Sequence, residues 1–113
     1  MYGLPKNFDD SFLKGRVLEL VCFSQNNLTL HFGAKIKIRI ESAFAYKTEL
    51  VIDVPTNESN LMELLGASVL SAHGDENGTL TLLFTDRQTL KVYDTSKQYE
   101  SYVITYEGTE IIV

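Results

Sequence analysis

The side chains suited to metal binding or nucleophilic chemistry are few in this sequence and lie far apart. The histidines are His31 and His73, and Cys22 is the single cysteine, within an apolar run. A zinc site needs several such ligands to converge, whereas His31 lies on the polar face of an alternating segment. We therefore predict no metal site and no cofactor, and we expect Cys22 to be a buried, inert thiol.

Adjacent carboxylates at Asp9-Asp10 and Asp75-Glu76 are the candidates for acid–base chemistry. Two carboxylates buried together can separate in pKa, but neighbouring residues in a turn usually point apart into water. Capping and solubility explain both pairs, so no catalytic residue is predicted. The sequence also lacks a glycine-rich phosphate loop, a serine nucleophile elbow and a paired-histidine zinc helix.

A row of cations is the third candidate. Lys35, Lys37 and Arg39 alternate with isoleucines, so they share one face of a predicted strand over about 13 Å. Such a row suits an anion or an acidic partner, although lysines also protect exposed strands from pairing with other chains. We favour the second interpretation, a solvated outer face.

The charge balance and the apolar pattern limit the classes of partner. The chain of 113 residues has a net charge of −5, whereas proteins that follow a nucleic-acid backbone present a basic surface. No apolar run reaches the ~18 to 20 residues that span a bilayer, and the N-terminal residues lack the apolar centre of a signal peptide. We expect a cytoplasmic protein with no nucleic-acid or membrane partner, folded as a single domain over residues 1–113.

Strands must position these side chains. Residues 35–41 alternate charged and apolar without a fault, and residues 28–32 have the same period. Gly33-Ala34 lies between these two segments and predicts a tight hairpin. A strand over 16–23 precedes them, so the sequence predicts a three-stranded antiparallel meander.

The same pattern returns later in the chain. An offset of 52 residues carries Leu28-Thr29-Leu30-His31-Phe32 onto Leu80-Thr81-Leu82-Leu83-Phe84. Because turn, charge and glycine positions agree together, we infer an internal duplication. The pseudo-repeats cover about residues 13–54 and 65–106, and a closing hairpin extends to residue 113.

The predicted fold class is mainly β, bordering on α+β. Two similar antiparallel three-stranded meanders form a sandwich or a partly open barrel, with one short helix between the halves. Asn57 or Thr56 can cap that helix, and Gly66 can terminate it. Between these ends, Leu61, Leu64 and Leu65 give an apolar stripe.

Short segments at both ends of the chain resemble a known family. They are Ser11-Phe12-Leu13-Lys14-Gly15 near the start, and Tyr99-Glu100-Ser101-Tyr102 with Gly108 and Ile111-Ile112-Val113 near the end. This layout is similar to that of a family of small bacterial domains of unknown function, and the likeness covers nearly the whole chain. The resemblance implies the same fold and a bacterial cytoplasmic origin. It implies no catalytic residue, because no activity is attached to the family.

The function that we favour is a non-enzymatic module that binds a protein partner or self-associates. Leu83 and Tyr93 are large side chains at outward positions of the second half, and Tyr99 and Tyr102 follow them. His31 stands where the other half has Leu83, so it joins these four as a predicted partner-binding residue. An immunity or accessory protein of a bacterial toxin is one version of this function.

Two other functions stay open. The halves could close around a small apolar ligand, in a pocket lined by the inward Leu, Ile and Phe side chains. The chain could also be an unrecognised small enzyme, with His73 near Asp75 as its acid/base pair. Because no specific catalytic motif is present, we lean toward a protein that is not an enzyme.

Overall fold

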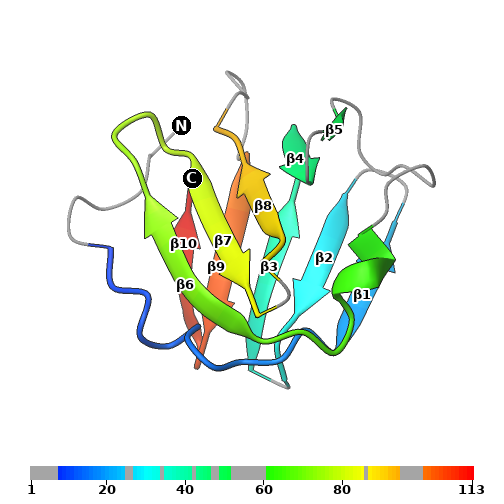
Figure 1. Cartoon of the computed structure of the whole chain (residues 1–113). Coiled ribbons are helices and arrows are strands. Elements are labelled where there is room, and N and C mark those ends of the chain that lie inside the picture. Colours follow the sequence, from blue (N-terminus) through cyan, green and yellow to red (C-terminus); the bar gives the residue numbers. More distant parts are fainter. Residues whose placement is uncertain are drawn as a thin grey trace.

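Two antiparallel five-stranded sheets form the fold in the computed structural model (Figure 1). The structure describes residues 8–24, 27–33, 35–41, 43–46, 49–51, 61–85, 87–94 and 101–113. The first sheet has the order β1-β2-β3-β9-β10, with strands Leu20–Phe23, Leu28–His31, Ile36–Ile40, Tyr102–Tyr106 and Thr109–Ile112. The second sheet has the order β5-β4-β8-β7-β6, with strands Glu49–Val51, Phe44–Tyr46, Thr89–Val92, Leu80–Phe84 and Val69–Gly74.

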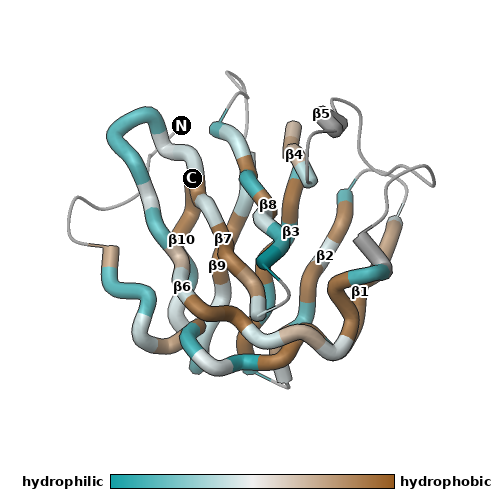
Figure 2. Tube along the Cα trace, in the orientation of Figure 1, coloured by the Kyte–Doolittle hydropathy of each residue, from teal (hydrophilic) through white to brown (hydrophobic). Residues whose placement is uncertain are grey.

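Alternation of apolar and polar residues determines which side of each strand faces the core. Apolar residues recur along the central strands (Figure 2), and the inward ones form one core cluster between the sheets. The inward side chains of the repeated segment are almost fully buried, as its period predicts: Leu28, Leu30, Phe32, Leu80, Leu82 and Phe84 are 0–1% exposed. Full burial of one such side chain contributes about 1.5–3 kcal/mol, and a slip of one residue in register would expose them all.

The predicted fold class is confirmed, with the sandwich rather than the barrel alternative. The chain is mainly β, and its two sheets do not close into a barrel. The predicted helix is reduced to η1, one turn of 3-10 helix over Leu61–Leu64, in the part of the chain that is described. Its predicted caps, Thr56 and Asn57, lie outside the described residues. Gly66, at a φ of 89°, follows η1 as the predicted terminator.

The two meanders have the same register. The pair Leu28↔Ile40 of β2 and β3 corresponds, at an offset of 52, to the pair Leu80↔Val92 of β7 and β8. In the strands that precede them the offset is 51, which relates Leu20 in β1 to Ser71 in β6. The additional residue therefore lies in the turn between β6 and β7.

The two meanders also cross each other at equivalent residues. An isolated antiparallel bridge joins Val17 to Ser68. On either side of it, Gly15 N–H donates to Val69 O at 2.8 Å, and Gly66 N–H donates to Leu18 O at 2.9 Å. These two hydrogen bonds are related by the same offset of 51, so the crossing has approximate two-fold symmetry.

Beyond each meander, the halves exchange their last two strands. The hairpin of β4 and β5 follows β3 in the chain but pairs with β8 of the second half. The closing hairpin of β9 and β10 follows β8 but pairs with β3 of the first half. Each sheet is therefore built from three strands of one half and two of the other. No helix among the described residues is long and apolar enough to cross a membrane.

Candidate functional site

A continuous row of side chains crosses the outer face of the first sheet. Strand pairing places Leu20 opposite His31, His31 opposite Lys37, and Lys37 opposite Thr105. Glu110 of β10 completes the row beside Thr105. Because successive residues of a strand point to opposite faces, these five alternate with inward core residues and point away from the second sheet. We call them the outer row.

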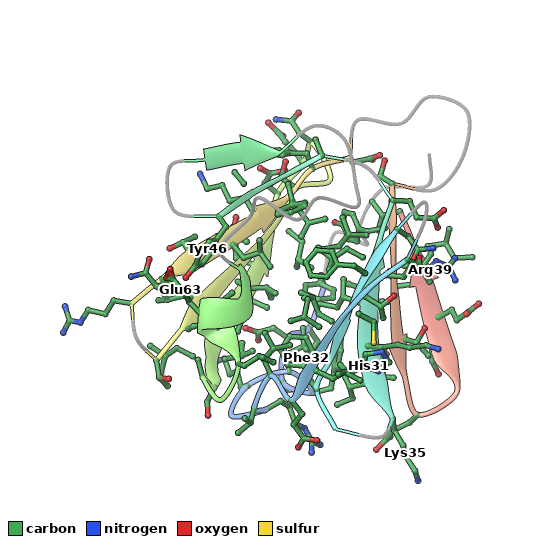
Figure 3. All side chains as sticks on the ribbon, turned by 90° about the vertical axis from the view of Figure 1, so that its right-hand side faces the viewer. His31, Phe32, Lys35, Arg39, Tyr46 and Glu63 are labelled. Atoms are coloured by element: carbon green, nitrogen blue, oxygen red, sulfur yellow. The ribbon has the colours of Figure 1, made fainter. Side chains whose placement is uncertain are left out.

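The outer row borders a pocket on this face. The pocket has a volume of about 600 Å³, and its lining residues are His31, Lys35, Lys37, Thr105, Glu107 and Gly108. A second hollow of about 310 Å³ adjoins it and shares Lys35 and Glu107, while Arg16 adds another cation. We call the two together the basic pocket. In Figure 3, Lys35 and Arg39 lie on the side of the first sheet that faces away from the second, whereas Phe32 lies between the sheets.

Backbone contacts position the charged groups of the basic pocket. Lys35 precedes β3, and its carbonyl oxygen accepts a hydrogen bond of 3.2 Å from Glu107 N–H. Glu107 and Gly108 both have positive φ, at 48° and 84°, as the central residues of a type I′ hairpin turn require. This turn joins β9 to β10, so it holds Glu107 beside the start of β3.

The cations of this face differ in how far they are neutralised. Arg39 Nε donates to Glu41 Oε2 at 2.9 Å, and this ion pair offsets the charge of Arg39. Lys35 and Lys37 are exposed, and neither makes an ion pair with another residue of the described part. The basic pocket therefore presents two ammonium groups and the Arg16 guanidinium, with an imidazole beside them, against one carboxylate from Glu107.

The second sheet does not repeat this arrangement. At the offset of 52, His31 corresponds to Leu83 and Lys37 to Thr89, which face each other in the pairing of β7 and β8. Lys35 corresponds to Arg87, and Arg39 to Lys91. The second sheet therefore has two cations at the equivalent positions, but it lacks the imidazole and the ammonium at the centre of the row.

The predicted partner-binding residues do not form one surface. Leu83 and Tyr93 are half-buried, and Tyr99 lies outside the described residues. His31 lines the basic pocket instead. The placement of Tyr102 on the surface is wrong, because its side chain is 0% exposed. Its register could have shown this, since Tyr102 has the same parity as Ile104 and opposes the inward Ile40.

Tyr102 instead makes a polar contact inside the core. Its hydroxyl donates to Gly78 O at 2.6 Å. Burial raises the pKa of the Tyr102 phenol well above its usual value, and the carboxylates of Asp94 and Asp75 raise it further. The phenol therefore stays neutral and keeps the proton that it donates. Asp94 is held nearby because its Oδ1 accepts a hydrogen bond of 2.7 Å from Ser101 Oγ.

The paired carboxylates cap backbone groups, as predicted. Asp75 Oδ1 accepts hydrogen bonds from Asn77 N–H and Thr79 N–H within its own turn. Asp10 Oδ2 accepts one of 2.9 Å from Ala72 N–H, which ties the N-terminal segment to β6. His73 is exposed on β6. Within the described ranges, no group of three or more His, Cys, Asp or Glu side chains could hold a metal ion.

Sequence reasoning missed the part of the basic pocket that comes from the other half. Thr105, Glu107 and Gly108 follow Lys37 by about seventy residues and reach it only because β9 pairs with β3. The Glu107-Gly108 turn was identifiable as the tip of a hairpin. No pattern within that hairpin indicates which sheet it joins.

Comparisons with known proteins give a family and no activity. The comparison with curated proteins found no match, and the comparison with solved structures found none. The model of a family of unknown function, DUF6188, matches residues 10–113, and the chain therefore belongs to that family.

Proposed function

We propose that this domain is a non-enzymatic interaction module that binds an acidic segment of a partner protein in the basic pocket. The observation that carries the proposal is the pocket of about 600 Å³ lined by His31, Lys35 and Lys37 on a chain with a net charge of −5. A local patch of opposite sign attracts an acidic partner and orients it, while the rest of the surface repels it.

The form of the pocket favours a polypeptide segment over a small apolar ligand. The inward Leu, Ile and Phe side chains pack against one another in a single core cluster between the sheets. The larger hollow of the basic pocket opens on the outer face, and all its lining residues except Gly108 have polar or charged side chains. An extended segment can lie across such a face and place several carboxylates near the lysines.

We also propose where the domain works and how its two halves arose. We place the domain in the bacterial cytoplasm, where the free thiol of Cys22 suits a reducing compartment. We attribute the two halves to an internal duplication, which the matching registers and the equivalent hydrogen bonds at the crossing support. The two sheets now differ at His31 and Lys37, whose equivalents in the second sheet are Leu83 and Thr89.

Fluorescence anisotropy tests the binding. An eight-residue Asp/Glu peptide with a fluorescent label is titrated with the protein, beside a neutral Ser/Gly peptide of the same length. We expect the acidic peptide to bind and the double variant Lys35→Glu/Lys37→Glu to weaken it about tenfold or more. Binding should also weaken between 50 and 300 mM salt, because these groups are solvent-screened.

The matched control changes the same net charge on the second sheet. Arg87→Glu/Lys91→Glu reverses two exposed cations that correspond to Lys35 and Arg39. It should change the affinity less than threefold. Equal losses in the two double variants would indicate a general charge effect and contradict a specific site, as would equal affinity for the acidic and neutral peptides.

A further inference from the structure

An exposed leucine stands at the end of the outer row. Leu20 is 49% exposed, and strand pairing places it directly opposite His31, which lines the basic pocket. The outer row therefore changes from an apolar side chain on β1 to an imidazole on β2 and an ammonium on β3. An acidic peptide without an apolar side chain would leave the exposed part of Leu20 in water.

We infer that the acidic segment carries a bulky apolar residue that packs on Leu20 while its carboxylates contact Lys37 and Lys35. This inference rests on the proposed function and specifies its ligand. Burial of apolar area supplies affinity that exposed charge pairs do not, and charge fixes the orientation of the segment. The partner is therefore an amphipathic acidic segment rather than a purely acidic one.

The spacing of the strands sets the spacing in the ligand. Neighbouring strands lie ~4.8 Å apart, so Leu20 on β1 and Lys37 on β3 are separated by about 10 Å. An extended peptide advances ~3.3 Å per residue. A segment that runs across the strands therefore places its apolar residue about three positions from the carboxylate that lies over Lys37. Lys35 lies two residues before Lys37 in the chain, so the next carboxylate contacts it by turning along β3.

The second sheet has no apolar residue at the position equivalent to Leu20, just as it has no histidine or lysine at the positions equivalent to His31 and Lys37. The residue equivalent to Leu20 is Ser71, which pairs with Leu83. Leu70 on β6 has the same exposed fraction as Leu20, 49%, but it lies at the register shift between Val69 and Ser71. Leu70 is therefore a control of equal exposure that does not belong to the outer row.

Two labelled peptides test the apolar contact at Leu20 separately from the acidic site. The first has the pattern Leu-Ser-Ser-Glu-Glu-Asp, and the second replaces its leucine by serine. We expect the wild-type protein to bind the leucine peptide about tenfold more tightly. The variant Leu20→Ser should remove that difference and leave the affinity for the serine peptide unchanged, whereas Leu70→Ser should preserve the tenfold difference. Thermal unfolding of each variant verifies that it is folded.

The possible outcomes test the apolar contact and the acidic site separately. If Leu20→Ser leaves the tenfold difference intact, or the wild type shows none, the apolar contact is wrong while the acidic site stands on the Lys35→Glu/Lys37→Glu result. If neither peptide binds, the proposed function itself is wrong. If Leu20→Ser and Leu70→Ser reduce the difference equally, the leucine binds nonspecifically and the inference fails.

Discussion

Tyr102 links the first sheet to a turn of the second sheet through one buried hydrogen bond. Its hydroxyl donates to Gly78 O, which belongs to the turn between β6 and β7. A hydroxyl buried without a partner is costly, and so is a carbonyl that loses its donor. The tyrosine therefore serves stability in the core and not the recognition for which its residue type is also suited.

We predict that Tyr102→Phe lowers the free energy of unfolding by about 1–3 kcal/mol, because Gly78 O then has no donor in the core. Urea denaturation followed by circular dichroism measures it. Tyr106→Phe, at a half-buried tyrosine of the same strand, should cost less. Equal losses would show that the hydroxyl of Tyr102 contributes nothing particular.

The raised pKa of Tyr102 predicts a loss of stability in alkali. The unfolded chain releases this proton near pH 10, while the folded chain retains it to a higher pH. The stability that the neutral Tyr102 phenol contributes is therefore fully present below about pH 10 and declines as the pH rises above it. Unfolding free energies between pH 8 and 11 should fall less steeply for Tyr102→Phe than for the wild type; parallel curves would contradict this assignment.

Gly78 is required for two separate reasons. Its φ is 83°, and a Cβ built there would lie 2.7 Å from Asp94 Oδ2. Gly33 has a similar φ of 84° but no atom within 4 Å of its built Cβ. We predict that Gly33→Ala costs about 1–2 kcal/mol, the strain of the left-handed backbone alone, and that Gly78→Ala costs more. Denaturant unfolding of both variants gives the difference, and equal costs would show that Asp94 moves aside freely.

Strand β9 connects the closing hairpin to the rest of the first sheet. It lies between β3 and β10, and Ile104 at its centre is fully buried. We predict that Ile104→Ala lowers the free energy of unfolding by about 2–5 kcal/mol, whereas Ile112→Ala on the outermost strand β10 costs less because that side chain is half-buried. Chemical denaturation measures both, and the reverse order would contradict the register of this hairpin.

How far the sequence predicts each element depends on the range of the interaction that defines it. The faces of β2, β3, β7 and β8 follow from alternation, because side-chain period is a local property of a strand. The strand with which β9 pairs does not follow from alternation, because β3 and β8 have similar alternating patterns. Lys35 and Lys37 were therefore identifiable as a row, but the contribution of Thr105 and Glu107 to the same pocket was not.

At the scale of the whole molecule, neither half contains a complete sheet. A cut between residues 56 and 57, in a segment outside the described residues, separates the strands β1–β5 from β6–β10. We predict that neither fragment forms a folded monomer and that an equimolar mixture regains the circular dichroism of the intact chain, since each sheet needs strands from both. A fragment that folds as a monomer, shown by light scattering, would contradict this.

The exchange of hairpins also has a consequence for synthesis on the ribosome. The basic pocket takes its lysines from the first half of the chain and its hairpin tip from residues 107 and 108. A nascent chain displays Lys35 and Lys37 long before that hairpin has emerged, so it has the charges without the pocket. For the acidic partner that we propose, we therefore expect binding only after residues 107 and 108 have emerged, and a product truncated before them should not compete for it.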